Sequence, residues 1–137
     1  VFRYPVRKLS YHRQDVLENM VQLGQEIAPE WVVIPSGSDL HQDHATIHDE
    51  ALRAFKHKTV LGYELPWNHI TFCASAFVTL ERRHLDRKWE ALTRYASQLE
   101  LGRPYFTKEF HESLARVRGL QVKSDWAEAF ELIRVVF

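Results

Sequence analysis

The chain has 137 residues, of which 45% are hydrophobic and 12% aromatic, so it can build one hydrophobic core and is too apolar for intrinsic disorder. Its 18 lysine and arginine residues balance its 18 aspartate and glutamate residues, so no overall field draws it to nucleic acid or anionic lipid. The single cysteine, Cys73, excludes an internal disulfide framework, and no apolar run approaches the roughly 18 residues of a membrane span. We therefore expect a single domain over residues 1–137 in a cytoplasmic, reducing compartment, without nucleic-acid or membrane partners.

The first half of the chain predicts a helix, a strand, a loop and a second helix. Ser10 can cap a helix whose apolar residues recur at helical spacing over 16–27. The run Trp31–Ile34 is short, apolar and rich in β-branched residues, which is typical of a strand buried on both faces. A polar loop over 36–39 then precedes a helix over 43–56.

The second half continues this alternation. Strands are expected over 59–65 and 76–80, a long helix over 85–96, and a shorter helix over 107–119 that the glycine at its end should stop. The segment 127–137 fits either a helix or a strand. Helices that alternate with buried strands indicate an α/β fold with a mainly parallel sheet.

Two histidines and two aspartates crowd into six positions directly after the first strand: Asp39, His41, Asp43 and His44. In open α/β sheets, ligands bind outside the carboxyl ends of the strands, and this loop lies at that end. Imidazole nitrogen is a good ligand for zinc, and a neighbouring carboxylate can hold the ring in one tautomer. The pattern favours a metal site.

Two other interpretations of these residues stay open at this point. Asp43 can simply cap the following helix, with the histidines in solvent. Alternatively His44, His48 and Asp49 can share one metal, as in the His-Asp phosphohydrolases, because His44 and His48 lie four residues apart on one helical face. Those enzymes are all helical, however, and the strand over residues 31–34 argues against them.

Seven short blocks follow one another along the chain: Pro35-Ser36, Asp39-Leu40-His41-Gln42-Asp43-His44, Glu50-Ala51-Leu52-Arg53-Ala54-Phe55-Lys56, Tyr63-Glu64, Lys88 with Ala91-Leu92, Tyr95-Ala96-Ser97-Gln98 and Ala127-Glu128-Ala129-Phe130. In this order they resemble the LmbE/PIG-L family of zinc-dependent N-deacetylases. The resemblance spans almost the whole chain. It implies a Rossmann-like α/β fold and the hydrolysis of an N-acetyl or other N-acyl group on an amino sugar or similar small molecule.

The resemblance also implies roles for individual residues. His44 matches a zinc ligand, and His41 matches a histidine that stabilises the oxyanion or protonates the leaving amine. Asp43 belongs to the same catalytic group in a supporting role. Asp39, Glu64, Ser97 and Gln98 are expected to contact substrate, although Glu64 can instead pair with a surface cation, and Ser97 and Gln98 can end a helix in water.

The chain departs from the family pattern in one respect. Family members carry an Ala-His-Pro-Asp-Asp-Glu-like motif after their first strand, which supplies two more zinc ligands and a carboxylate base, and residues 1–137 contain no such motif. We therefore expect the chain to correspond to the carboxyl-terminal part of the fold, without its first βαβ units. An isolated chain of this kind should self-associate, and a non-catalytic module that binds a glycan or a partner protein is the alternative.

Overall fold

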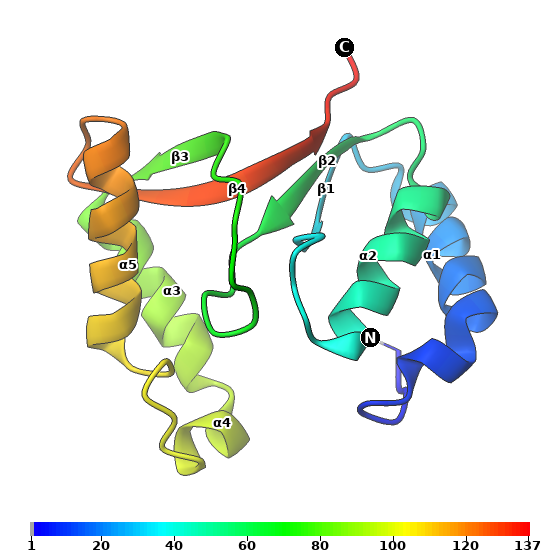
Figure 1. Ribbon diagram of the computed structural model, residues 1–137, viewed down its shortest axis with the longest axis horizontal. Coiled ribbons are helices and arrows are strands. Elements are labelled where there is room, and N and C mark those ends of the chain that lie inside the picture. The colour runs from blue at the N-terminus through cyan, green and yellow to red at the C-terminus, as the bar shows by residue number, and fades with distance from the viewer. Residues whose placement is uncertain (1) are drawn as a thin grey trace. The chain divides into compact units, whose positions relative to one another are not determined.

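The computed structural model describes residues 2–137 and confirms the α/β class (Figure 1). Within these residues, no helix has both the length and the apolar character needed to cross a bilayer. The elements are, in chain order, the 3-10 helix η1 (Leu9–His12), α1 (Arg13–Ile27), β1 (Trp31–Pro35), α2 (Gln42–Ala54), β2 (Thr59–Tyr63), β3 (Ala76–Leu80), α3 (Arg82–Thr93), α4 (Ala96–Glu100), α5 (Lys108–Gln121) and β4 (Trp126–Arg134).

Hydrogen bonds join the four strands in the order β1-β2-β4-β3. β1 and β2 run parallel, with Pro35 opposite Tyr63, whereas β4 runs antiparallel to β2, with Phe130 opposite Tyr63. The sheet is therefore mixed, although the sequence predicted a mainly parallel one. That prediction assumed that every helix returns the chain for another parallel strand. The helix α2 does so between β1 and β2, but the chain re-enters beside β2 along β4 in the opposite direction.

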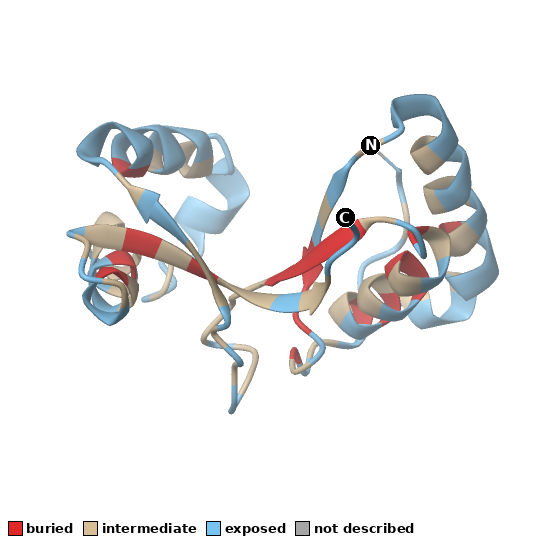
Figure 2. Cartoon of the chain, turned by 90° about the horizontal axis from the view of Figure 1, so that it is seen from above, coloured by how far each residue is buried: buried red, intermediate tan, exposed pale blue. Residues whose placement is uncertain are grey.

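The chain forms two compact units, which are described separately. The first unit contains the residues up to Ser75 together with Phe130–Phe137. In this unit α2 contacts both α1 and β1, and the core gathers apolar side chains from β1, α2 and β2. Figure 2 marks the buried positions in red. The central core residues are Ile34, Ala51, Phe55 and Val60.

Strand β1 is buried on one face only. Val32 and Ile34 belong to the core, but the alternating residues Trp31 and Val33 are 62% and 53% exposed. Side chains alternate between the two faces of a strand, and the packed helices cover the face that carries Ile34. The expectation of burial on both faces is therefore wrong.

A fully buried carboxylate ties α1 to α2. Glu50 on α2 accepts a hydrogen bond from Arg13 Nε on α1 and another from Arg53 Nη1, each at 2.5 Å. Burial alone would raise the pKa of Glu50, but the hydrogen bonds and positive charges of Arg13 and Arg53 outweigh it and hold the pKa below its usual value. The ion pair is therefore formed at neutral pH.

Two helix boundaries, one in each unit, differ from the sequence prediction. Ser10 lies inside η1, and α1 begins at Arg13 without a side-chain cap, so Ser10 is not the cap. In the segment expected to form one helix over 85–96, α3 ends at Thr93 and the short helix α4 begins at Ala96.

In the second unit, Ala76–Ala129, a glycine that was predicted to end a helix instead allows close packing. Helix α5 continues through Gly119 to Gln121, so Gly119 does not stop it. A Cβ atom at Gly119 would lie 2.6 Å from the carbonyl oxygen of Ser124 and 2.8 Å from Cα of Trp126. Glycine is needed here because the chain after α5 passes against the helix backbone, which is close packing rather than termination.

Candidate functional site

The loop that follows β1 is held by a carboxylate from β4. Ser36 is buried, and its hydroxyl donates to Glu131 Oε2 at 2.7 Å, while the backbone N–H of Gly37 donates to the same oxygen at 3.2 Å. The Asp39 N–H then donates to the Ser36 carbonyl at 3.1 Å and closes a turn. Glu131 was missed in the sequence, because it lies in a segment whose type the pattern left open.

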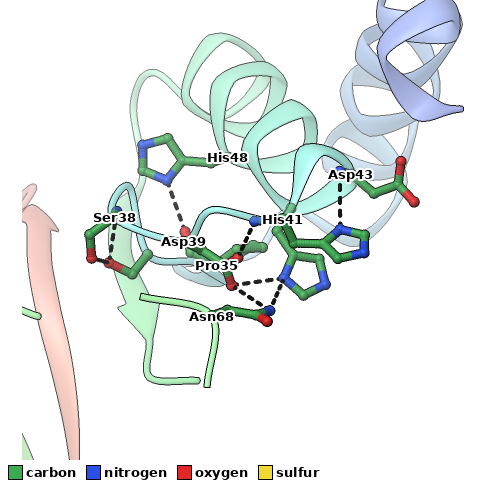
Figure 3. A network of polar contacts seen from close by, with 9 residues as sticks. Pro35, Ser38, Asp39, His41, Asp43, His48 and Asn68 are labelled. Atoms are coloured by element: carbon green, nitrogen blue, oxygen red, sulfur yellow. Dashed lines mark hydrogen bonds and ion pairs between the residues drawn. The ribbon is translucent and has the colours of Figure 1, made fainter. Parts of the chain in front are cut away.

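Asp39 is the centre of the site (Figure 3). Its side chain is only 2% exposed, and Oδ1 accepts from the backbone N–H of His41 at 2.8 Å. Oδ2 contacts His44 Nδ1 at 2.8 Å and accepts from Asn68 Nδ2 at 3.3 Å. Burial and the negative charge of Asp39 raise the pKa of Tyr63, at the end of β2. The buried carboxylate therefore connects the loop, the start of α2 and the turn that carries Asn68.

These contacts determine the tautomer of His44. A carboxylate oxygen can only accept, so His44 Nδ1 must carry the proton and donate it to Asp39. Asn68 Nδ2 also lies 3.3 Å from His44 Nδ1, but two donors cannot bond, so the amide donates to Asp39. The other ring nitrogen, Nε2, keeps its lone pair. The ring is 29% exposed, and a carboxylate-oriented histidine of this kind is a common metal ligand.

His41 takes the opposite tautomer. It is the N-cap of α2, and its Nδ1 accepts from the backbone N–H of Asp43 at 3.2 Å. A neutral ring that accepts at Nδ1 carries its proton at Nε2. The rings of His41 and His44 lie with centroids 4.5 Å apart. Two adjacent imidazoles thus differ in function: Nε2 of His41 is a hydrogen-bond donor, and Nε2 of His44 is a lone-pair donor.

The other polar side chains near this pair have structural partners. Both oxygens of Asp43, which is buried, accept backbone N–H groups, from Arg7 at 2.6 Å and from Leu9 at 3.2 Å. Asp43 therefore binds the N-terminal segment to α2, and the N-cap of α2 is His41. The helix-cap interpretation of Asp43 is wrong in this detail.

The rival metal set does not assemble. His48 Nδ1 contacts the Pro35 carbonyl oxygen at 2.8 Å, and Asp49 pairs with Arg13 at 3.4 Å. Across residues 2–137, no group of three His, Cys, Asp or Glu side chains is placed to hold one ion. His44, His48 and Asp49 therefore do not form the shared site of a phosphohydrolase.

The remaining predicted substrate contacts lie in different parts of the chain. Glu64 is half-buried directly after β2, in the same unit as His44. Ser97 and Gln98 are exposed on α4 in the second unit. Their contact with a substrate stays a prediction. Asn68, which sequence reasoning did not select, also donates to the Asp39 side chain, and its only sequence signal is a place in a loop after a strand.

A pocket opens beside His41. It has a volume of about 350 Å³ and is formed by residues of the loop at 40–42 and the turn at 67–70. His41 and Asn68 belong to its wall. The backbone links its two sides, because the Leu40 N–H donates to the Asn68 carbonyl at 2.8 Å.

Comparison with solved structures shows the fold of the chain. The conserved protein TT1542 from Thermus thermophilus superposes with a TM-score of 0.74 at 20% identity, covering 90% of this chain and 60% of that one. The zinc-inhibited form of teicoplanin deacetylase Orf2 gives 0.71 at 19% identity over 95% of this chain and 54% of that one. GalB, the 4-carboxy-2-hydroxymuconate hydratase from Pseudomonas putida KT2440, gives 0.70 at 21% identity over 90% and 61%.

These neighbours include a deacetylase and a hydratase, so the shared architecture does not select one reaction. The sequence matches no protein-family model and no curated protein. The chain spans between 54% and 61% of the length of these three neighbours. What the likeness establishes is that this chain shares the α/β fold of these three structures.

Proposed function

We propose that the chain forms part of a zinc-dependent hydrolase that removes an N-acyl group from an amino sugar or a related small conjugate. The observation that carries the proposal is the pair of adjacent histidines with opposite tautomers, fixed by Asp39 and by the Asp43 N–H. Amide hydrolysis needs both a metal ligand and a hydrogen-bond donor for the oxyanion. The fold shared with a deacetylase solved in a zinc-inhibited form supports the same proposal.

The donor set fits one metal ligand. His44 Nε2 has a free lone pair, and its Nδ1–H is held by a buried carboxylate, which is the usual arrangement behind a zinc-bound imidazole. Catalytic zinc commonly has three protein ligands, and residues 2–137 hold no group of three. We propose that the other ligands and the carboxylate base come from polypeptide outside these residues. When bound, zinc would polarise the amide carbonyl and activate a water.

The tautomer of His41 supports one of its two expected roles. The neutral ring carries one proton, at Nε2, because Nδ1 already accepts from the Asp43 N–H. A hydrogen bond from Nε2 to the amide oxygen leaves that proton in place and stabilises the developing negative charge. Full transfer of the same proton to the leaving amine would leave an imidazolate, which is far less stable. We therefore assign His41 the oxyanion role.

The test uses the full-length natural protein with N-acetylglucosamine conjugates, and it measures both bound zinc and released amine. His44→Ala should lose zinc and activity together. His41→Asn should keep its zinc and lose about 10²-fold to 10³-fold in kcat, the usual cost of one oxyanion donor. His57→Ala, at an exposed histidine, is the matched control and should change neither quantity.

Two results would overturn the proposal. Loss of bound zinc in His48→Ala as well as in His44→Ala would place the metal at the rival set of His44, His48 and Asp49. A wild-type protein that binds no zinc and releases no amine from these conjugates would support the non-catalytic binding module instead.

A further inference from the structure

We infer that Glu131 is a positioning residue of the candidate site: it holds the loop that carries Asp39, and through Asp39 it orients His44 as a metal ligand. Glu131 lies on β4, which is two strands away from β1 in the sheet order. The inference rests on the proposed function for the role of His44, and it adds to that function a residue that acts from across the sheet.

The residues of the loop after β1 each donate a hydrogen bond either to Glu131 or to Ser36. The Ser36 hydroxyl donates to Glu131 Oε2 at 2.7 Å, and the Gly37 N–H donates to the same oxygen at 3.2 Å. Because the hydroxyl proton of Ser36 is used on Glu131, the Ser36 oxygen accepts from Ser38, whose N–H lies at 3.3 Å and whose hydroxyl lies at 3.0 Å. The Asp39 N–H donates to the Ser36 carbonyl at 3.1 Å. Ser36 is therefore the centre of the loop, and Glu131 holds Ser36 in place.

Glu131 reaches the loop because β2, the strand between them, carries a glycine at the crossing point. Gly62 is the partner of Glu131 in the pairing of β2 with β4. A Cβ atom at Gly62 would lie 3.2 Å from Glu131 Oε2 and 3.1 Å from Cα of Ser36, which is tighter than ordinary van der Waals contact. The glycine leaves the space in which the carboxylate passes over β2. This observation is independent of the hydrogen bonds, and it shows that the approach of Glu131 to the loop is built into the sheet.

The contacts continue from the loop to the His44 ring. The backbone of Asp39 is bound to Ser36, and its side chain, which is 2% exposed, accepts the His44 Nδ1 proton at 2.8 Å. A shift of the loop would therefore displace the oxygen that orients the ring. Because a ligating histidine depends on such a partner for its tautomer and orientation, loss of Glu131 should weaken metal binding at His44.

The experiment measures two properties of the full-length protein: its zinc affinity, by competition with a chromophoric chelator, and solvent exchange of the His44 Nδ1 proton in the zinc-free state, by ¹H–¹⁵N NMR. Loss of an orienting partner lowers metal affinity about 10-fold to 100-fold, and because Glu131 acts through Ser36, we expect about tenfold for Glu131→Ala. Exchange of the His44 proton should become faster in the same variant. Glu131→Gln should recover most of both losses, because one amide oxygen in the place of Oε2 can accept from both Ser36 and Gly37. Ser36→Ala removes a single oxygen atom and should match Glu131→Ala, so it provides the test if Glu131→Ala does not fold.

Arg134→Met is the matched control. Arg134 also lies on β4, but its Nη1 donates at 3.0 Å to the carbonyl of Phe55, the C-cap of α2, rather than to the loop. This variant should lose stability without any change in zinc affinity or in exchange of the His44 proton. Gly62→Ala should weaken zinc binding by displacing Glu131, so adding Glu131→Ala to it should cause little further loss.

The outcomes separate this inference from the proposed function. Native zinc affinity and native proton exchange in both Glu131→Ala and Ser36→Ala would overturn the positioning role, while zinc loss in His44→Ala would still uphold the hydrolase. An equal effect of Arg134→Met would also overturn it, because the losses would then follow from general weakening of β4. Fully additive losses in the double variant would reject the route over β2. A protein that binds no zinc, but whose His44 proton exchanges faster in Glu131→Ala, would retain the positioning role and reject the hydrolase.

Discussion

Replacing Asp39 by asparagine tests the tautomer argument directly, because the change preserves shape and removes one acceptor. In the native site both carboxylate oxygens accept, Oδ1 from the His41 N–H and Oδ2 from His44 Nδ1, each at 2.8 Å. An asparagine has one oxygen and one NH₂ group. If its oxygen stays on the His41 N–H, its NH₂ faces His44 Nδ1, and that nitrogen must become the acceptor.

The consequence for His44 is a change of tautomer. With Nδ1 as the acceptor, the ring proton moves to Nε2 and the lone pair for a metal is lost. If the asparagine flips, the His44 tautomer is kept but the NH₂ group meets the His41 N–H, which leaves a donor unpaired. That contact costs about 1–3 kcal/mol of stability. Loss of such an orienting partner lowers metal affinity by about 10-fold to 100-fold.

The assay is long-range ¹H–¹⁵N NMR of the histidine side chains, combined with zinc titration of the full-length protein. We expect the native His44 to be protonated at Nδ1. The Asp39→Asn variant should either shift that proton and bind zinc more weakly, or keep it and lose thermal stability. Asp49→Asn is the control, because Asp49 is exposed and pairs only loosely with Arg13. A variant that keeps the Nδ1 proton, the native stability and the native zinc affinity would refute the reasoning.

Three further outcomes follow from the packing. Glu50→Gln should lower the free energy of unfolding by about 2 kcal/mol, because it weakens charge-assisted hydrogen bonds. Since the pKa of Glu50 is lowered in the native protein, this stability is present above pH 4.5 and is lost as the pH falls through the folded-state pKa. The acid denaturation curves of the native protein and the variant should therefore converge at low pH. Gly119→Ala should lower the free energy of unfolding by about 1–3 kcal/mol in denaturant titrations, because the new methyl group meets backbone atoms of Ser124 and Trp126. Helix propensity alone predicts that the variant is more stable by about 1 kcal/mol, so a stabilised variant would contradict the close packing. Glu131→Ala should leave the buried Ser36 hydroxyl without its carboxylate partner and lower the melting temperature, whereas Glu131→Gln should recover part of the loss; equal effects of the two variants would argue against this hydrogen bond.

The sequence predicted the strand–loop–helix order around the histidines because each part leaves a local signal. The β-branched run over residues 31–34 and the helical spacing after Asp43 are properties of neighbouring residues, and both elements form close to the expected places. The residues that hold the site in place leave no such local signal. Asn68 and Glu131 reach the loop from turns and strands far along the chain, so no local spacing reveals them.

The direction of strand pairing was unpredictable for a similar reason. Apolar residues alternate along β4 in the same way whether the strand runs parallel or antiparallel to β2. Only the path of the intervening chain decides the direction of the strand. Gly119 shows the same limit at one residue, since its role depends on what passes beside it rather than on its own helix. Opposite tautomers for two histidines three residues apart also follow from contacts alone.

Asp43 makes the backbone at residues 7 and 9 a reporter of the candidate site. The carboxylate of Asp43 accepts the N–H groups of Arg7 and Leu9, while its own N–H holds His41. Arg7 is kept in the left-handed region, at a φ of 64°, which is unfavourable for a residue with a side chain. Because this backbone conformation is unfavourable, loss of the two hydrogen bonds to Asp43 should favour local opening of the segment. Amide hydrogen exchange at Arg7 and Leu9 should accordingly speed up in any variant that loosens the start of α2, giving a readout of His41 order that requires neither metal nor substrate.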